Sequence, residues 1–216
     1  MILRVGLTGG VASGKSTASR LLAEHGAAVR DADVVVARTY LPGRPGAAVV
    51  AKLFGERVLT AAGGVDRAAL GAIVLTDAGA RRRLEQVIHP IVRAEIEAWL
   101  AKLASSEKPP LVAMVEAALL VETGAYRDYH RLVTVSADVE LRRARALAAG
   151  WNDVVLAGVL AAQLDDRGRE AAADYVIRND EGAIELCADV DRVWRDLRRD
   201  WELLQAGKPL PRRRLE

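Results

Sequence analysis

Short apolar runs alternate with longer amphipathic stretches along the chain. The apolar runs cover residues 2–8, 27–30, 111–116, 132–136 and 174–178. Between them, apolar side chains recur at helical spacing over residues 16–24, 84–103 and 186–204. Such alternation is typical of a parallel sheet with helices on its faces. We therefore predict an α/β protein with a five-stranded parallel sheet flanked by helices.

Two stretches depart from this simple alternation. Residues 42–90 are repeatedly broken by glycine, and they predict a helical insertion on one side of the sheet. Residues 137–168 are helical in pattern but interrupted by Gly150 and Gly158, which predicts a mobile lid. Residues 207–216 contain three consecutive arginines and predict a disordered basic tail, which is either solvated or binds an anionic partner.

Composition narrows the class of protein. The 216 residues are 51% hydrophobic, which supplies a sizeable core and excludes disorder of the whole chain. Lys plus Arg number 31 and Asp plus Glu number 29, so no broad charge favours a nucleic-acid or membrane partner. The lone Cys187 excludes a disulfide scaffold. Without a signal-peptide pattern or a long apolar run, we expect a cytoplasmic protein.

A glycine-rich motif directly follows the first predicted strand. Residues 9–16 satisfy G-x-x-x-x-G-K-[ST] and open the first predicted helix. Gly9 and Gly14 let the backbone approach phosphate oxygens, and the helix start adds partial positive charge. Lys15 reaches the β- and γ-phosphates, and the Ser16 hydroxyl coordinates Mg²⁺. The expected nucleotide-binding residues are Gly9, Gly10, Val11, Ala12, Ser13, Gly14, Lys15, Ser16 and Thr17, although Thr17 is equally explained as an ordinary helix residue.

This phosphate-binding loop, or P-loop, occurs in kinases, GTPases and motor ATPases. A GTPase needs a guanine reader such as N-K-x-D, and Asn179 followed by Asp180 lacks the lysine and the spacing. Large ATPase machines generally need longer chains. The sequence therefore favours a small-molecule kinase using a nucleoside triphosphate with Mg²⁺. A non-catalytic, ATP-binding regulatory module remains the alternative from a different class.

Acidic residues follow the second predicted strand. Asp31 and Asp33 lie where the carboxyl ends of parallel strands face one crevice, together with the P-loop. A carboxylate there can accept the proton of an attacking hydroxyl group. From spacing alone, Asp33 is equally well explained as this catalytic carboxylate or as the N-cap of the helix that follows.

Taken in order, these residues resemble the dephospho-CoA kinase family. The resemblance rests on the P-loop, on residues 31–33, and on further marks that span nearly the whole chain. These marks include Arg38, Pro42, Gly43, Phe54, Gly55, Asp66, Arg67, Leu70, Leu84, Glu85, His89, Pro90, Leu119, Leu120, Glu122, Gln163, Ala173, Asp174, Val176, Ile177 and Asn179.

The resemblance implies ATP-dependent phosphorylation of the ribose 3′-hydroxyl of dephospho-coenzyme A, the last step of coenzyme A synthesis. It implies a single P-loop kinase domain over residues 1–216. Its core would comprise residues 1–41, 111–136 and 169–206, with a helical substrate-binding region over 42–110 and a lid over 137–168. Another nucleoside or nucleotide kinase of this architecture is the nearest enzymatic rival. The expected assembly is a monomer or a small homo-oligomer.

Residue roles carried over from the family are as follows. Asp33 becomes the catalytic base, Lys15 the phosphate-directed cation and Arg143 the lid arginine that approaches the phosphates. Asn179 is expected to contact the adenine of ATP. The expected acceptor-site residues are Arg38, His89, Leu120 and Glu122, of which Arg38 is equally explained as a solvated helix residue and His89 as the end of a helix.

Three positions depart from the family pattern. Ala12 stands where glycine is frequent, and we expect that change to be harmless. Glu116 stands where the family commonly has the shorter aspartate, and it is expected to hold a Mg²⁺-bound water. Leu147 replaces a second lid arginine, with Arg142 and Arg145 as possible substitutes.

Overall fold

The computed structural model describes residues 1–211, which form two compact units. One unit contains Met1–Arg30 and the chain from Leu103 onward, and the other contains Asp31–Lys102. The consecutive arginines Arg212 to Arg214 of the predicted tail lie outside the described residues. Within the described part of the chain, no helix is long and apolar enough to cross a membrane.

A five-stranded sheet organises the first unit, in the order β2-β3-β1-β4-β5. The pairs β1 with β3, β1 with β4, and β4 with β5 run parallel. Each predicted strand is confirmed with bounds that differ by one residue at most. The strands are β1 (Leu3–Gly9), β2 (Ala28–Asp31), β3 (Val112–Glu116), β4 (Arg131–Ser136) and β5 (Tyr175–Arg178).

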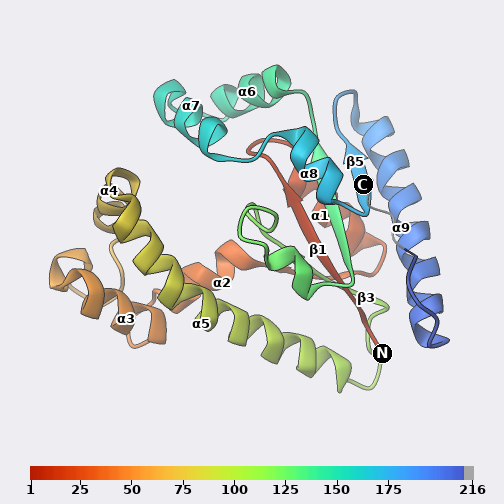
Figure 1. The fold of residues 1–216 in the computed structure, drawn as a ribbon, viewed down its shortest axis with the longest axis horizontal. Coiled ribbons are helices and arrows are strands. Elements are labelled where there is room, and N and C mark those ends of the chain that lie inside the picture. Colours follow the sequence, from red (N-terminus) through yellow and green to blue (C-terminus); the bar gives the residue numbers. More distant parts are fainter. Residues whose placement is uncertain (212–216) are drawn as a thin grey trace. The chain divides into compact units, whose positions relative to one another are not determined.

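The main core lies between the sheet and two helices, α1 (Lys15–Glu24) and α9 (Ala183–Gln205). Alternate residues of β1 point to this face, so Leu3, Val5 and Leu7 are wholly buried. The predicted helical spacing of α9 is confirmed, because Leu186, Val190 and Leu197 are buried against the strands. Figure 1 shows α9 running beside β5.

The opposite face of the sheet has a smaller apolar cluster. Leu132 on β4 packs with Leu120 and Ala173, and α8 (Asp166–Ala172) contacts β4 on the same side. Gly6 keeps this face close to its neighbours, since a Cβ atom there would lie 2.9 Å from Cδ1 of Leu120. The chain segment after β3 is thereby fixed on the sheet.

Buried charges connect β4, β5 and α9. Arg131 donates through Nε to Asp200 at 2.5 Å, and the Tyr175 hydroxyl donates to the same carboxylate at 2.6 Å. Nη2 of Arg131 also donates to the carbonyl oxygen of Pro211 at 3.0 Å. Residues 207–211 belong to the segment that the sequence predicts to be disordered, but they include a backbone group bound to the core.

The predicted lid stretch holds two helices, α6 (Val139–Ala148) and α7 (Asp153–Ala162), which precede α8. Gly150, with φ 86°, lies between α6 and α7 as the sequence suggested. The predicted break at Gly158 is wrong, because this glycine lies inside α7. Only Leu156 of α7 is buried, and a single glycine costs a helix about 1 kcal/mol, which does not by itself end it.

The second unit is helical, as predicted for the insertion. Its elements are α2 (Ala32–Thr39), α3 (Pro45–Phe54), the short 3-10 helix η1 (Glu56–Val58), α4 (Arg67–Thr76) and most of α5 (Ala78–Ala104). Gly46 permits α3 to approach α2, since a Cβ there would lie 2.6 Å from the Thr39 carbonyl oxygen.

Pro90 lies inside α5, which continues for 27 residues. The interpretation of His89 as the end of a helix is therefore wrong. Ile88, Val92 and Ile96 are buried at helical spacing on both sides of the proline. This shared apolar face favours a continuous helix despite the hydrogen bond that proline removes.

Candidate functional site

The P-loop joins β1 to α1, where the motif predicted it. β1 ends at Gly9, and Gly14 caps α1 in the left-handed region with φ 91°. The Gly14 carbonyl accepts hydrogen bonds from the N–H groups of Thr17 and Ala18, both at 3.0 Å. The first N–H groups of a helix lack intrahelical acceptors, so the loop ends at a group of donors suited to an anion.

Ala12 has an unusual backbone conformation within this loop. Its φ is 55°, and it is the one non-glycine residue with positive φ in the described part of the chain. The left-handed region costs an L-residue about 1–2 kcal/mol because Cβ crowds the following carbonyl oxygen. The expectation that alanine is harmless here therefore needs correction with respect to folding stability.

Lys15, Ser16 and Glu116 come together at the carboxyl ends of β1 and β3. The Lys15 Nζ atom lies 3.5 Å from Oε1 of Glu116, and the Ser16 hydroxyl lies 3.5 Å from the same oxygen. Glu116 is the last residue of β3, and its backbone pairs in register with Leu7 of β1. The residue is 7% exposed, so its carboxylate acts within a partly dehydrated site.

This group of atoms fits a magnesium ion bound with nucleotide phosphates. Mg²⁺ prefers hard oxygen ligands and usually takes one or two from the protein, with water and phosphate oxygens for the rest. A hydroxyl and a carboxylate oxygen at 3.5 Å from each other supply such a pair. No cluster of three or more His, Cys, Asp or Glu side chains suited to a metal occurs among residues 1–211.

Asn179 supports the P-loop from the end of β5. Its side-chain Nδ2 donates to the Ser13 carbonyl oxygen at 2.8 Å. A Cβ atom on Gly14 would overlap this amide, which gives Gly14 a second reason to be glycine. The Asn179 carbonyl accepts from Nη1 of Arg145 at 2.9 Å. The amide group is thus engaged with the loop, and its contact with adenine stays a prediction.

Leu120 and Glu122 follow β3, as the sequence indicated, but both have partners within the first unit. Leu120 is 5% exposed and belongs to the apolar cluster described above, whereas Leu119 is 44% exposed. Glu122 Oε1 accepts from Nη2 of Arg169 at 3.0 Å and from the backbone N–H of Leu164 at 3.1 Å. Their roles toward an acceptor stay predictions.

The three arginines of α6 have different surroundings. Arg143, the predicted lid arginine, pairs with Asp153 of α7 at 2.9 Å, and its side chain is 47% exposed. Arg142 is 4% exposed and lies against Gly10 of the P-loop. The structure therefore brings Arg142, and not Arg143, to the P-loop. The approach of Arg143 to the phosphates stays a prediction.

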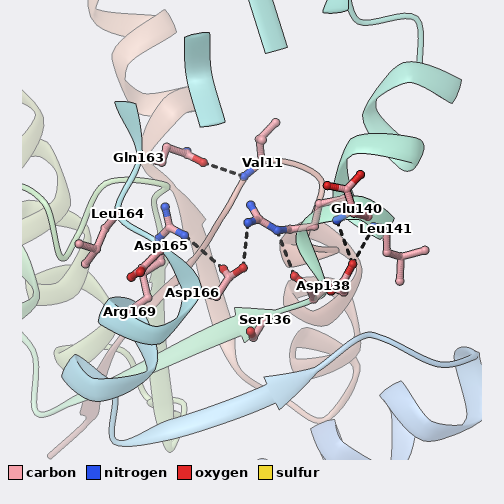
Figure 2. A network of polar contacts seen from close by, with 12 residues as sticks. Val11, Ser136, Asp138, Glu140, Leu141, Gln163, Leu164, Asp165, Asp166 and Arg169 are labelled. Carbon is pink, nitrogen blue, oxygen red and sulfur yellow. Dashed lines mark hydrogen bonds and ion pairs between the residues drawn. The ribbon is translucent and has the colours of Figure 1, made fainter. Parts of the chain in front are cut away.

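Sequence reasoning missed the polar network around the P-loop that Figure 2 shows. Asp166 binds both Arg142 and Arg169, at 2.8 Å and 3.3 Å, and Gln163 Oε1 accepts from the Val11 N–H at 3.0 Å. Gln163 stood among the marks of the family resemblance, but without a role. Arg169 belongs to the polar sequence of residues 165–170, which predicts an exposed segment, although its side chain is buried. Arg142, Gln163 and Asp166 of this network line a cleft of about 640 Å³, which is also lined by Ser136, Glu170 and Arg178.

The remaining predicted site residues belong to the second unit. Asp31 is the N-cap of α2, because its Oδ1 accepts from the N–H groups of Asp33 and Val34 at 2.7 Å and 3.3 Å. The interpretation of Asp33 as the helix cap is therefore wrong. Asp33 lies exposed in the first turn of α2, Arg38 in its last turn, and His89 on the exposed side of α5.

Comparisons with known proteins agree on one family. A family model described as dephospho-CoA kinase matches residues 3–185. A dephospho-CoA kinase of Frankia casuarinae is 43% identical over 199 residues, which cover 91% of this chain and 85% of that protein. One of Anaeromyxobacter dehalogenans is 40% identical over 195 residues, covering 90% and 92%.

Solved structures give the same picture. A crystal structure from Thermus thermophilus has a TM-score of 0.76 at 30% identity, and the match covers 89% of this chain and 95% of the other. A dephospho-CoA kinase from Campylobacter jejuni has a TM-score of 0.68 at 24% identity, with 92% and 98% covered. At this lower identity the likeness concerns the fold alone.

Proposed function

The chain belongs to the dephospho-CoA kinase family, and we infer that it transfers the γ-phosphate of ATP to the ribose 3′-hydroxyl of dephospho-coenzyme A. The acceptor follows from the family match over residues 3–185, and the observation that carries the use of ATP is the convergence of Lys15, Ser16 and Glu116 beside the P-loop. A cation, a hydroxyl and a buried carboxylate in this arrangement suit a magnesium-bound triphosphate.

The P-loop residues bind and orient the triphosphate. Backbone N–H groups at the start of α1 face the anion, and Lys15 places its positive charge on the β- and γ-phosphates. Ser16 and Glu116 would hold Mg²⁺, and the bound ion would supply positive charge to the phosphates. The chain itself supplies alignment and charge, which is what phosphoryl transfer chiefly requires.

Asp33 serves as the base that accepts the proton of the acceptor hydroxyl. Two observations support this role. Asp33 follows the end of β2 by two residues, and Asp31 already caps α2. The carboxylate of Asp33 is therefore not needed to begin the helix. A positioned base contributes typically 10²–10⁴-fold to a rate.

Other roles follow from the family. Arg38, His89, Leu120 and Glu122 form the acceptor site, and Asn179 contributes to the adenine site. Arg143 meets the phosphates when residues 137–168 close as a lid. Residues 42–110 form the substrate-binding region. The enzyme works in the cytoplasm as a monomer or a small homo-oligomer, without nucleic-acid or membrane partners.

An ADP-release assay across several acceptors tests this function. With Mg²⁺ and ATP, dephospho-coenzyme A should stimulate ADP release far more than any nucleoside monophosphate. Faster turnover of a nucleoside monophosphate would identify the chain as a different nucleotide kinase. ATP binding without acceptor-dependent ADP release would identify a regulatory module. Mass spectrometry of the product, which gains one phosphate, distinguishes transfer from hydrolysis of ATP.

A further inference from the structure

Gly10 is tightly covered by an arginine side chain. A Cβ atom added at Gly10 would overlap Nη1 of Arg142 and lie 2.9 Å from its Cζ. The backbone of Gly10 does not have a positive φ, so it does not adopt the left-handed conformation that favours glycine over alanine. A methyl group at this P-loop position would therefore have to displace the guanidinium group of Arg142, and it would also lie 3.3 Å from Nη1 of Arg169.

Two hydrogen bonds hold the Arg142 side chain in this place. Nε donates to the carbonyl oxygen of Ala137 at 3.1 Å, and Nη2 donates to Oδ2 of Asp166 at 2.8 Å. These bonds use Nε and Nη2, whereas the Arg142 atom nearest to Gly10 is Nη1. Within the described residues Nη1 has no hydrogen-bond acceptor, so its contact with the loop is one of close packing.

Charges around Arg142 are balanced by a buried network. Asp166 also accepts from Nη1 of Arg169 at 3.3 Å, and Arg169 donates through Nη2 to Glu122 at 3.0 Å. Arg142 and Arg169 are 4% and 1% exposed. Two cations and two carboxylates thus alternate, and removing one partner would leave a buried charge uncompensated.

The next P-loop residue is held from the same side. The N–H group of Val11 donates to Oε1 of Gln163 at 3.0 Å, and Gln163 lies three residues before Asp166. Gly10 packing and the Val11 hydrogen bond are independent contacts, and both join the first half of the P-loop to residues 163–169. Figure 2 shows Gln163 reaching the N–H group of Val11, and Asp166 beside Arg169, with which it pairs.

We propose that Arg142 is a positioning residue of the P-loop, fixed by Asp166 and packed on Gly10, which holds the loop in its phosphate-binding conformation. The segment 163–169 thereby sets the affinity of the P-loop for Mg²⁺·ATP before an acceptor binds. A loop that is already ordered loses less conformational entropy when it binds the triphosphate. This proposal rests on nucleotide binding at the P-loop and is independent of the identity of the acceptor.

A double-mutant cycle between Gly10 and Arg142 tests the proposal. The measurement is the equilibrium dissociation constant of Mg²⁺·ATP without acceptor, by titration calorimetry. We expect Gly10→Ala to weaken binding by about tenfold or more, because the methyl group displaces the guanidinium. Arg142→Ala should weaken binding to a similar degree. The double variant should bind as Arg142→Ala does, within about threefold, since the added methyl then meets no guanidinium.

Control variants separate positioning from a general loss of stability. Arg199 forms an exposed ion pair with Asp196 at 3.1 Å, so Arg199→Ala removes a paired arginine elsewhere and should leave ATP binding unchanged. Asp166→Asn should weaken ATP binding, whereas Asp165→Asn should not, because asparagine still caps α8. Arg142→Lys should not restore binding, since lysine cannot contact Ala137, Asp166 and Gly10 at once.

Two results would overturn the proposal. One is an unchanged ATP affinity in Gly10→Ala. The other is full additivity of the two losses of ATP affinity in the double variant. Additivity would show that the methyl group acts directly on the bound phosphates and not through Arg142. If Gly10→Ala fails to fold, the comparison of Asp166→Asn with Asp165→Asn decides. Equal ATP affinities of those two folded variants would then reject the role of Arg142. Activity toward a different acceptor would contradict the proposed function and leave this cycle unaffected.

Discussion

The ammonium group of Lys15 lies 3.5 Å from the carboxylate of Glu116, at the junction of the P-loop and β3. Glu116 is 7% exposed, so this ion pair exists in a partly dehydrated environment. Attraction between unit charges is stronger there than in bulk water. Lys15 is therefore held near the position where the motif requires a cation, and its long side chain loses little further freedom when phosphates arrive.

Lys15→Ala should reduce kcat/KM by about 10²-fold or more and leave the fold intact. The variant removes the phosphate-directed charge, and electrostatic stabilisation of this type is worth several kcal/mol. Steady-state kinetics with ATP and dephospho-coenzyme A measure the loss, and circular dichroism checks the fold. Lys108→Ala, an exposed lysine, serves as the control with unchanged kinetics. Activity above about a tenth of the wild type would contradict the role of Lys15.

Asp33→Asn should preserve ATP binding and lower kcat by about 10²-fold or more, because asparagine cannot accept the acceptor's proton. The start of α2 should be unaffected, since Asp31 provides its cap. Asp31→Ala gives the complementary result, a loss of about 1 kcal/mol in the free energy of unfolding. Single-turnover kinetics and urea unfolding measure the two effects. Near-normal turnover of Asp33→Asn would show that this carboxylate is not the base.

Arg143→Ala should lower kcat strongly and change ATP affinity little. In the structure Arg143 is paired with Asp153, and we expect its contact with phosphates to form in the closed, reacting state. Arg142→Ala should show the opposite pattern, with weaker ATP binding. Asp153→Asn, which releases Arg143, should retain kcat. Equal and small losses of kcat for alanine variants of Arg142, Arg143 and Arg145 would contradict the lid assignment.

Ala12→Gly should stabilise the protein by about 1 kcal/mol, because glycine adopts the left-handed conformation without crowding. For a chain of this length, such a gain raises Tm by about 2–4 °C. Differential scanning calorimetry without nucleotide measures the shift. Gly63→Ala offers a matched reverse change, since Gly63 has φ 82° and open space around its Cβ position. A fall in Tm of Ala12→Gly would refute the assignment of strain at Ala12.

The sequence predicted the sheet and the P-loop well because their signals are local. β1 is a short apolar run, and α1 is an amphipathic helix. The motif between them is recognised by glycines that allow the backbone to approach phosphates. Charged side chains were harder to place, because hydrophobic periodicity assigns a charge to the surface. Arg142 and Arg169 are buried only because carboxylates distant in sequence, Asp166 and Glu122, neutralise them. For the same reason the pattern could not distinguish Arg142 from Arg143.

The buried carboxylate of Asp200 has a consequence for behaviour on heating. Dehydrating Arg131 and Asp200 opposes folding near room temperature, even though their geometry is close and the Tyr175 hydroxyl adds a bond. The hydration of charged groups becomes less favourable as temperature rises, so this opposing contribution shrinks on warming. The net contribution of this ion pair to the junction of β4, β5 and α9 should therefore grow on warming, whereas the stabilisation from a purely apolar contact of the same size levels off.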